Sequence, residues 1–242
     1  MQLFGREHPL EQRLLMVFRA EPHSLAKWLP ADVHLRPFRG LGIAGIWIER
    51  RPQKASRLLP ARLVATQNIV HHIYVTNDLA PQREKAGILV VRRDTSSRWQ
   101  SWSTTGPEVV RRHHARFRVR RRHESIDLIA DSDDRVMHVA LAARLTEHLP
   151  DDSAFRSVAD ATAFLQPSAA FLGAVGGLAP LVSHRSTKWR LQPLAVKRVE
   201  SSLFSSPTTP SGRLEFDSAF TLRSIEFSWQ QEPAFCGDAA TA

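Results

Sequence analysis

The chain has 242 residues, of which 43% are hydrophobic and 24% are charged, and its formal net charge is +9 at pH 7. This length and apolar content are ordinary for a globular protein that forms one large β-rich domain or two small ones. No apolar run approaches the roughly 18 residues that a membrane-spanning helix needs, so we expect no membrane partner.

Cysteine content and the first residues bear on where the protein works. The chain has one cysteine, Cys236, which excludes a disulfide framework and a zinc site built from cysteines. The opening residues, MQLFGREHPLEQR, lack the regions that make up a secretory signal peptide. We therefore predict a cytoplasmic protein.

Apolar runs and alternating patterns predict about nine short strands along the chain. They fall at Leu14–Arg19, Leu41–Glu49, Leu63–Thr76, Ala86–Ser97, Ala115–Arg121, Ser125–Ala130, Val136–Arg144, Lys188–Phe204 and Leu214–Trp229. Within the second strand, Gly42 and Gly45 indicate a bulge, a sharp bend or a close backbone approach.

Two segments are predicted to be helices. Pro22 suits the first turn of a helix over His23–Leu29, and Pro30 ends it. Ser157–Gln166 has an apolar stripe, a capping serine and Asp160 at the third position. Ser96–Thr104 is expected to form a helical turn.

The element pattern predicts a mainly β fold with a few helices, of the α+β class, built as one antiparallel barrel or sandwich. Composition does not shift along the chain, so we expect a single domain over residues 1–232 and a flexible tail over residues 233–242.

The strongest chemical signal lies at the end of one buried strand. The apolar run Ile88–Val91 leads directly into Arg92, Arg93 and Asp94. Charge at the end of a buried strand is costly unless it is paired. These residues therefore either line the rim or floor of a cavity, or form a structural Arg–Asp pair that closes the strand.

The densest basic block is Arg111–Arg122, in which apolar and basic residues alternate. This pattern predicts a strand with one apolar and one basic face. We favour a solvated basic face over a nucleic-acid interface, because no aromatic residues interleave the charges to stack on bases. Trp99, Trp102 and Trp189 are expected in the core.

Histidines occur as two adjacent pairs, His71–His72 and His113–His114. Neighbouring residues on a strand point to opposite faces, so neither pair is suited to one metal ion, and we predict no metal site. Asn68 shares a strand face with His72, where it either lines a cavity or forms a cross-strand pair.

Several motifs together resemble the acetoacetate-decarboxylase-like family, most of whose members in this branch have no assigned function. The motifs are LAKWLPADVHL, NIVHHIYV, VVRRDTSS and FDSAFTLRSIEFSW, and the resemblance spans about Leu10 to Trp229. It implies an antiparallel, cone-shaped β-barrel around one internal cavity, flanked by a few helices.

The chain departs from the family's catalytic pattern. The decarboxylase uses a lysine Schiff base on a strand that ends in Pro-Lys-Lys, and these residues align with Val91, Arg92 and Arg93. Arginine stays protonated and cannot form the imine. The nearest lysine, Lys85, precedes the strand. The family's acidic residues on the strand before Glu49 are also absent.

We therefore expect a barrel, needing no cofactor, that binds a small carboxylic or keto acid. Arg92 and Arg93 would hold its acidic group, because a guanidinium grips a carboxylate with two hydrogen bonds. Asp94 would orient one guanidinium, and Asn68 and His72 would add polar contacts.

Two alternatives remain open. The first is a lyase or decarboxylase-like enzyme that forms no imine, with His72 as general base; Lys85 is the other candidate catalytic residue. The second, which we disfavour, is nucleic-acid binding through Arg111–Arg122. A homo-oligomer is also left open.

Overall fold

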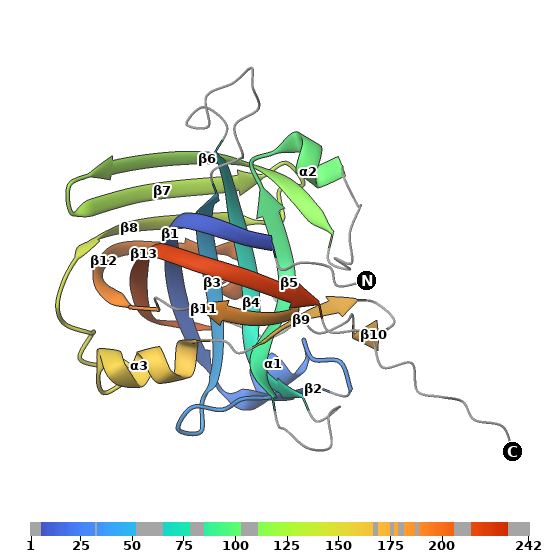
Figure 1. The fold of residues 1–242 in the computed structure, drawn as a ribbon. Coiled ribbons are helices and arrows are strands. Elements are labelled where there is room, and N and C mark those ends of the chain that lie inside the picture. The colour runs from blue at the N-terminus through green and yellow to red at the C-terminus, as the bar shows by residue number, and fades with distance from the viewer. Residues whose placement is uncertain are drawn as a thin grey trace, which may run out of the picture.

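A computed structural model describes residues 6–31, 33–51, 65–77, 85–102, 111–166, 169–174, 177–178, 182–186, 189–205 and 214–231 (Figure 1). The described strands are β1 (Arg6–Ala20), β2 (Val33–Leu35), β3 (Gly42–Arg51), β4 (Thr66–Asn77), β5 (Lys85–Thr95), β6 (Arg112–Arg122), β7 (Ser125–Ser132), β8 (His138–Leu145), β9 (Ala169–Ala174), β10 (Gly177–Leu178), β11 (Val182–Ser186), β12 (Gln192–Ser201) and β13 (Glu215–Gln231). The described helices are α1 (Pro22–Ala26), α2 (Arg98–Trp102), α3 (Val158–Leu165) and α4 (Ser202–Ser205).

The strands form one sheet that closes on itself. Strands β13, β1, β3, β4 and β5 pair in that order and form a continuous wall. From β5 the sheet returns to β13 through β6, β7, β8 and β12, which closes a barrel of nine strands. It also returns through β9 and β11, because β5 pairs with β9 and β11 pairs with β13. The wall therefore belongs to two closed circuits (Figure 1).

The predicted class is confirmed: the fold is mainly β with a few short helices. The strand pairing is mixed rather than wholly antiparallel, because β5 runs parallel to both β6 and β9. A parallel neighbour requires the chain to cross back before it pairs, and α2 lies in the connection between β5 and β6.

Each face of the wall has its own hydrophobic core. One core packs wall residues against the β6–β8 meander and includes Ile46, Ile73, Leu128, Leu141 and Phe204. The other core packs the opposite face against α3 and includes Leu15, Trp47, Tyr74, Phe164 and Trp189. Because side chains alternate along a strand, successive wall residues belong to different cores.

Helix α3 is tied to the wall by polar contacts. Ser157 caps it as predicted, accepting a hydrogen bond from the Asp160 amide at 3.1 Å. Before the helix, the buried Asp217 carboxylate of β13 accepts hydrogen bonds from the Ala154 amide at 2.7 Å and the Ser153 hydroxyl at 2.8 Å. The FDSA motif therefore anchors the segment that leads into α3.

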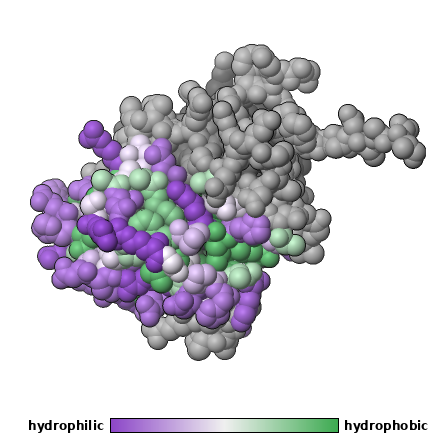
Figure 2. All heavy atoms as spheres, turned by 90° about the horizontal axis from the view of Figure 1, so that it is seen from below, coloured by the Kyte–Doolittle hydropathy of each residue, from purple (hydrophilic) through white to green (hydrophobic). Residues whose placement is uncertain are grey.

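The two short helices deviate from the predicted bounds. The helix expected over His23–Leu29 is α1, at Pro22–Ala26, and the expected helical turn is α2. Seen from the end that carries α1 and α3, hydrophobic residues of the coloured part gather in one patch, and hydrophilic residues border it on the left and below (Figure 2). None of the helices in the described ranges has the length and hydrophobicity needed to cross a membrane.

His71 and His72 are buried on opposite faces of the wall, as predicted. The His71 ring packs edge-on against Phe204, at 5.2 Å between centroids, in the meander-side core. The His72 ring packs against Trp47 and Tyr74 in the other core. The pKa of each imidazole is lowered from 6.5 to about 3, chiefly by burial, and the nearby Arg92 charge contributes to the shift of His71. Both rings are therefore neutral in the folded protein at neutral pH.

We predict that acidification below pH 6.5 destabilises the fold through these two histidines. Below this pH the unfolded chain binds protons that the folded chain excludes. The free energy of unfolding therefore falls by roughly 1–2 kcal/mol per pH unit for each histidine between pH 6.5 and 3. His71→Leu should reduce the slope, because it removes one of the two imidazoles. The substitution breaks no hydrogen bond of the His71 ring, because both ring nitrogens lack a hydrogen-bond partner in the described structure.

Urea unfolding at several pH values between pH 7.5 and pH 5 measures this slope. The exposed His23 provides the control His23→Gln, which should leave the slope unchanged. An identical slope in the wild type and in His71→Leu would show that His71 does not drive the effect.

Candidate functional site

The two predicted ligand-binding arginines lie on opposite faces of the wall. In the β4–β5 pairing, His71 opposes Arg92 and His72 opposes Val90, so the register shifts at Val91. This bulge turns Arg92 toward the meander-side core and leaves Arg93 in register with Val70, on the face of Trp47. The expectation that both guanidiniums converge on one acidic group is therefore wrong.

Arg92 is engaged by two carboxylates. Its Nε and Nη2 donate to Asp94 at 2.9 and 2.8 Å, and Nη2 donates to Asp134 of the β7–β8 turn at 2.9 Å. Burial works to lower the Arg92 pKa, but these acceptors outweigh it and raise the pKa. Asp94 orients Arg92, as predicted, yet the arrangement is the structural pair that closes the strand end.

A second buried guanidinium, Arg13 of β1, lies on the opposite face and is fully inaccessible to solvent. It forms an ion pair with Glu49 of β3, whose carboxylate also accepts hydrogen bonds from Arg51 at 2.7 and 3.0 Å. One buried carboxylate thus serves two guanidiniums. We call Arg13, Glu49 and Arg51 the buried ion cluster.

Mutual attraction between the carboxylate and the guanidiniums favours the charged forms of the ion cluster. Burial alone would raise the pKa of Glu49, but Arg13 and Arg51 outweigh it and lower this pKa to about 2. Burial lowers the pKa of Arg13, and the Glu49 charge opposes that shift. Of the three charged groups that form the ion cluster, two are positive and one is negative.

Two tryptophans surround the Arg13 guanidinium. Its central carbon lies 4.2 Å from the Trp47 ring centroid and 5.9 Å from that of Trp189, distances typical of cation–π contacts. The indole nitrogen of Trp189 is buried and has no hydrogen-bond partner in the part of the chain that the structure describes. An unpaired buried N–H is costly, so this donor is a feature that a bound acceptor would explain.

Sequence reasoning missed this cluster. The signal was present in two apolar strands that carry opposite charges: Arg13 precedes one run and Glu49 ends another. Antiparallel pairing places the two residues directly opposite each other. Recognising them as partners required knowing that β1 and β3 are neighbours.

His72 lies beneath Trp47 and against the backbone of β3. A side chain at Gly45 would place its Cβ 2.5 Å from His72 Nε2, so the glycine makes room for the ring, which is the predicted close approach. The near-neutral pKa expected of a general base is wrong for His72, whose pKa is lowered by burial to about 3.

The remaining predicted site residues lie apart from one another. Asn68 is in register with Glu49 and Thr95, so it shares a face with the buried ion cluster. Lys85 begins β5, opposite Asn77, and lies at the other end of that strand from Arg92. Among the described residues, no group of three or more metal-ligating side chains comes together.

Comparison with known proteins gives likeness in structure alone. No known family profile matches the chain, and no curated protein matches its sequence. An acetoacetate decarboxylase-like enzyme from Sphingomonas wittichii RW1 is 14% identical with a TM-score of 0.57, over 93% of this chain and 90% of that one.

Two further solved structures agree with this likeness. The enduracididine biosynthesis enzyme MppR complexed with pyruvate is 11% identical with a TM-score of 0.59, over 93% of this chain and 89% of that one. Acetoacetate decarboxylase from Legionella pneumophila subsp. pneumophila str. Philadelphia 1 is 12% identical with a TM-score of 0.51, over 92% and 87%. The chain therefore has the fold of the acetoacetate-decarboxylase-like proteins.

Proposed function

We propose that this protein binds a small carboxylic or keto acid beside the buried ion cluster. The observation that carries the proposal is the fully buried Arg13 guanidinium, which is flanked by two indole rings and pairs with Glu49, a carboxylate that also pairs with Arg51. A buried excess of positive charge favours an anion, because charge–charge attraction is little screened in the interior.

Hydrogen-bonding groups near the ion cluster match a carboxylate. The Trp189 indole N–H is a buried donor without a described acceptor, and a carboxylate supplies acceptors only. Arg93 extends from the same face of the wall, one strand beyond Val70 and two beyond Trp47. Arg13 and Arg93 would hold the acidic group, and Trp189 would donate to it.

These contacts change the set of binding residues that the sequence predicts. Asn68 stays in the proposal as a polar contact on the same face, and His72 as the support beneath Trp47. Arg92 and Asp94 are left out, because their mutual ion pair and Asp134 account for them. That MppR, a protein of the same fold, has a structure complexed with pyruvate supports a small keto acid as the first ligand to test.

We predict that Arg93→Gln weakens pyruvate binding at least about tenfold, since a hydrogen bond to a charged group contributes roughly 1.5–3 kcal/mol. Titration calorimetry measures the affinity. The matched control is Arg92→Gln, which removes the same charge one residue away on the other face. It should lower the melting temperature and leave the affinity within about twofold. Equal weakening by both variants would refute the assignment to the Arg93 face.

Trp189→Phe tests the indole donor separately, because it keeps the aromatic ring and removes only the N–H. We expect weaker binding of carboxylic acids and an unchanged or higher melting temperature, since a buried unpaired donor is lost. If no acid in a panel of small carboxylic and keto acids binds the wild type at millimolar concentration, the proposed function is wrong.

A chemical trapping experiment distinguishes a lyase that forms an imine from a protein that only binds the acid. We predict that borohydride reduction with pyruvate or another keto acid leaves the intact mass unchanged, because the aligned strand carries arginine where an imine would need lysine. A mass increase equal to one reduced adduct would instead show imine formation, and peptide mapping would then decide whether Lys85 is the nucleophile.

A further inference from the structure

Helix α2 exposes two tryptophans beside the basic strand β6. Trp99 is 79% exposed and Trp102 is 81% exposed, so the prediction that they lie in the core is wrong, whereas Trp189 is buried as predicted. Residues three apart on a helix lie on one side of it, so the two indoles form one aromatic surface. Exposure of two large apolar rings is unfavourable in water and marks a surface that contacts something else.

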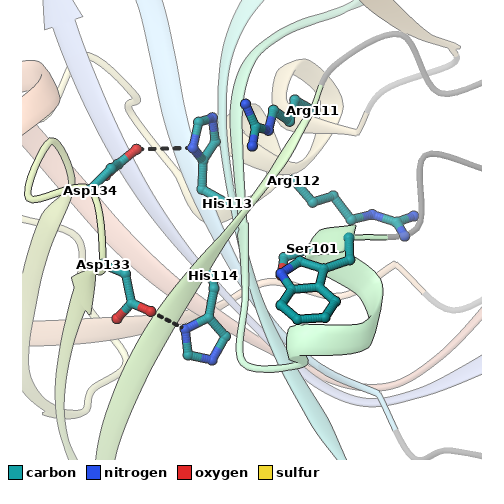
Figure 3. A pocket seen from close by; sticks show the side chains of 8 residues that line it. Ser101, Arg111, Arg112, His113, His114, Asp133 and Asp134 are labelled. Atoms are coloured by element: carbon teal, nitrogen blue, oxygen red, sulfur yellow. Dashed lines mark hydrogen bonds and ion pairs between the residues drawn. The ribbon is translucent and has the colours of Figure 1, made fainter.

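A pocket of about 200 Å³ opens beside Trp102. Trp102 and Ser101 of α2 form one side of it, and residues 111–114 at the start of β6 form another. The β7–β8 turn completes it with Asp133 and Asp134 (Figure 3). This volume suits one ring system rather than a large ligand.

Each acidic residue of this pocket is paired with basic side chains. Asp133 accepts from His114 Nδ1 at 2.7 Å (Figure 3), and it also pairs with Arg116 at 3.3 Å. Asp134 pairs with His113 Nδ1 at 2.9 Å and with Arg92 at 2.9 Å. These pairs leave the exposed Arg111, which has no ion pair with a described residue, as a cation at the mouth.

Further cations continue away from the pocket along β6. Arg116 and Arg118 pair with Asp133 and Asp131 at 3.3 and 3.4 Å, yet their side chains stay 76% and 75% exposed. Arg120 is also exposed, because alternate residues of this strand face solvent. Alternate residues on a strand are about 6.7 Å apart, so the guanidiniums form a regular row. The predicted basic face is thus confirmed, and it begins where the two indoles lie.

We propose that α2 and β6 form a binding surface for single-stranded nucleic acid. Unpaired bases would stack on Trp99 and Trp102, and Arg111 and the β6 row would contact successive phosphates. Exposed aromatic rings next to a line of cations are the combination with which proteins bind single strands without reading sequence. This surface is separate from the buried ion cluster, and the proposal does not depend on the proposed acid-binding function.

The first experiment uses the full chain and a fluorescein-labelled oligothymidylate of about 12 nucleotides, a length within the range of single-strand binding sites. Fluorescence anisotropy at low salt measures its affinity for the wild type and the Trp99→Ala/Trp102→Ala variant. We expect at least about a fivefold loss for each stacked base removed. Both side chains are exposed, so the melting temperature should be retained, as should the affinity for pyruvate.

Two matched arginine variants separate a specific surface from general attraction to a positive protein. Arg111→Gln should weaken binding and reduce the salt dependence by about 0.7 in the slope of log affinity against log salt concentration. Arg198→Gln removes an exposed charge, paired with Glu200, from β12, which is far from α2 in sheet order, and should change neither quantity. Equal effects of both variants would overturn the proposal.

Binding of other ligands tests whether the surface prefers single-stranded nucleic acid. Duplex DNA of the same length should bind more weakly, because its bases are not available for stacking. Thymidine monophosphate binding as tightly as the oligonucleotide would place a free nucleotide at the pocket and overturn a strand-binding surface. Tryptophan-dependent binding to phosphatidylserine vesicles without oligonucleotide binding would also overturn it, as would the absence of oligonucleotide binding at low salt.

Discussion

This structure depends on the register in which its central strands pair. The wall formed by β13, β1, β3, β4 and β5 has a hydrophobic core on both faces. A slip of one residue between two wall strands would exchange the contents of the two cores, since side chains alternate along a strand. Neither face of the wall is open to solvent, so side chains displaced by a slip could not turn into water, as they can in a sheet with one exposed face. The packing of both cores therefore fixes the strand pairing.

The same constraint governs where charge enters the interior. Arg13 and Arg92 are both buried, one on each face, and each is held by carboxylates. Removing one partner from a buried pair leaves an uncompensated charge, which costs far more than the pair contributes. The two arginines differ in what remains around them: Arg92 is gripped by two carboxylates, whereas Arg13 shares one carboxylate and faces aromatic rings. For this reason we regard Arg92 as a structural cation and Arg13 as a candidate binding group.

Much of the fold was predictable, because strand alternation, proline positions and the Ser157 cap are local signals. The opposite facing of His71 and His72 followed from alternation alone. The site was less predictable, since Arg13 and Glu49 meet only through the pairing of distant strands. The bulge at Val91 was not predictable, because an apolar run looks the same with or without an unpaired residue. Trp99 and Trp102 were misplaced because composition makes tryptophan a core residue by default.

The division of one edge of β5 between two neighbours has a consequence for how this protein can diverge. The first half of that edge pairs with β9 and the second half with β6, so one strand helps to enclose two separate interiors. Adjacent positions 92 and 93 belong to different interiors because side chains alternate along the strand, and the bulge at Val91 sets which interior each one faces. Substitutions that reshape one interior can therefore accumulate while the other continues to hold the barrel closed.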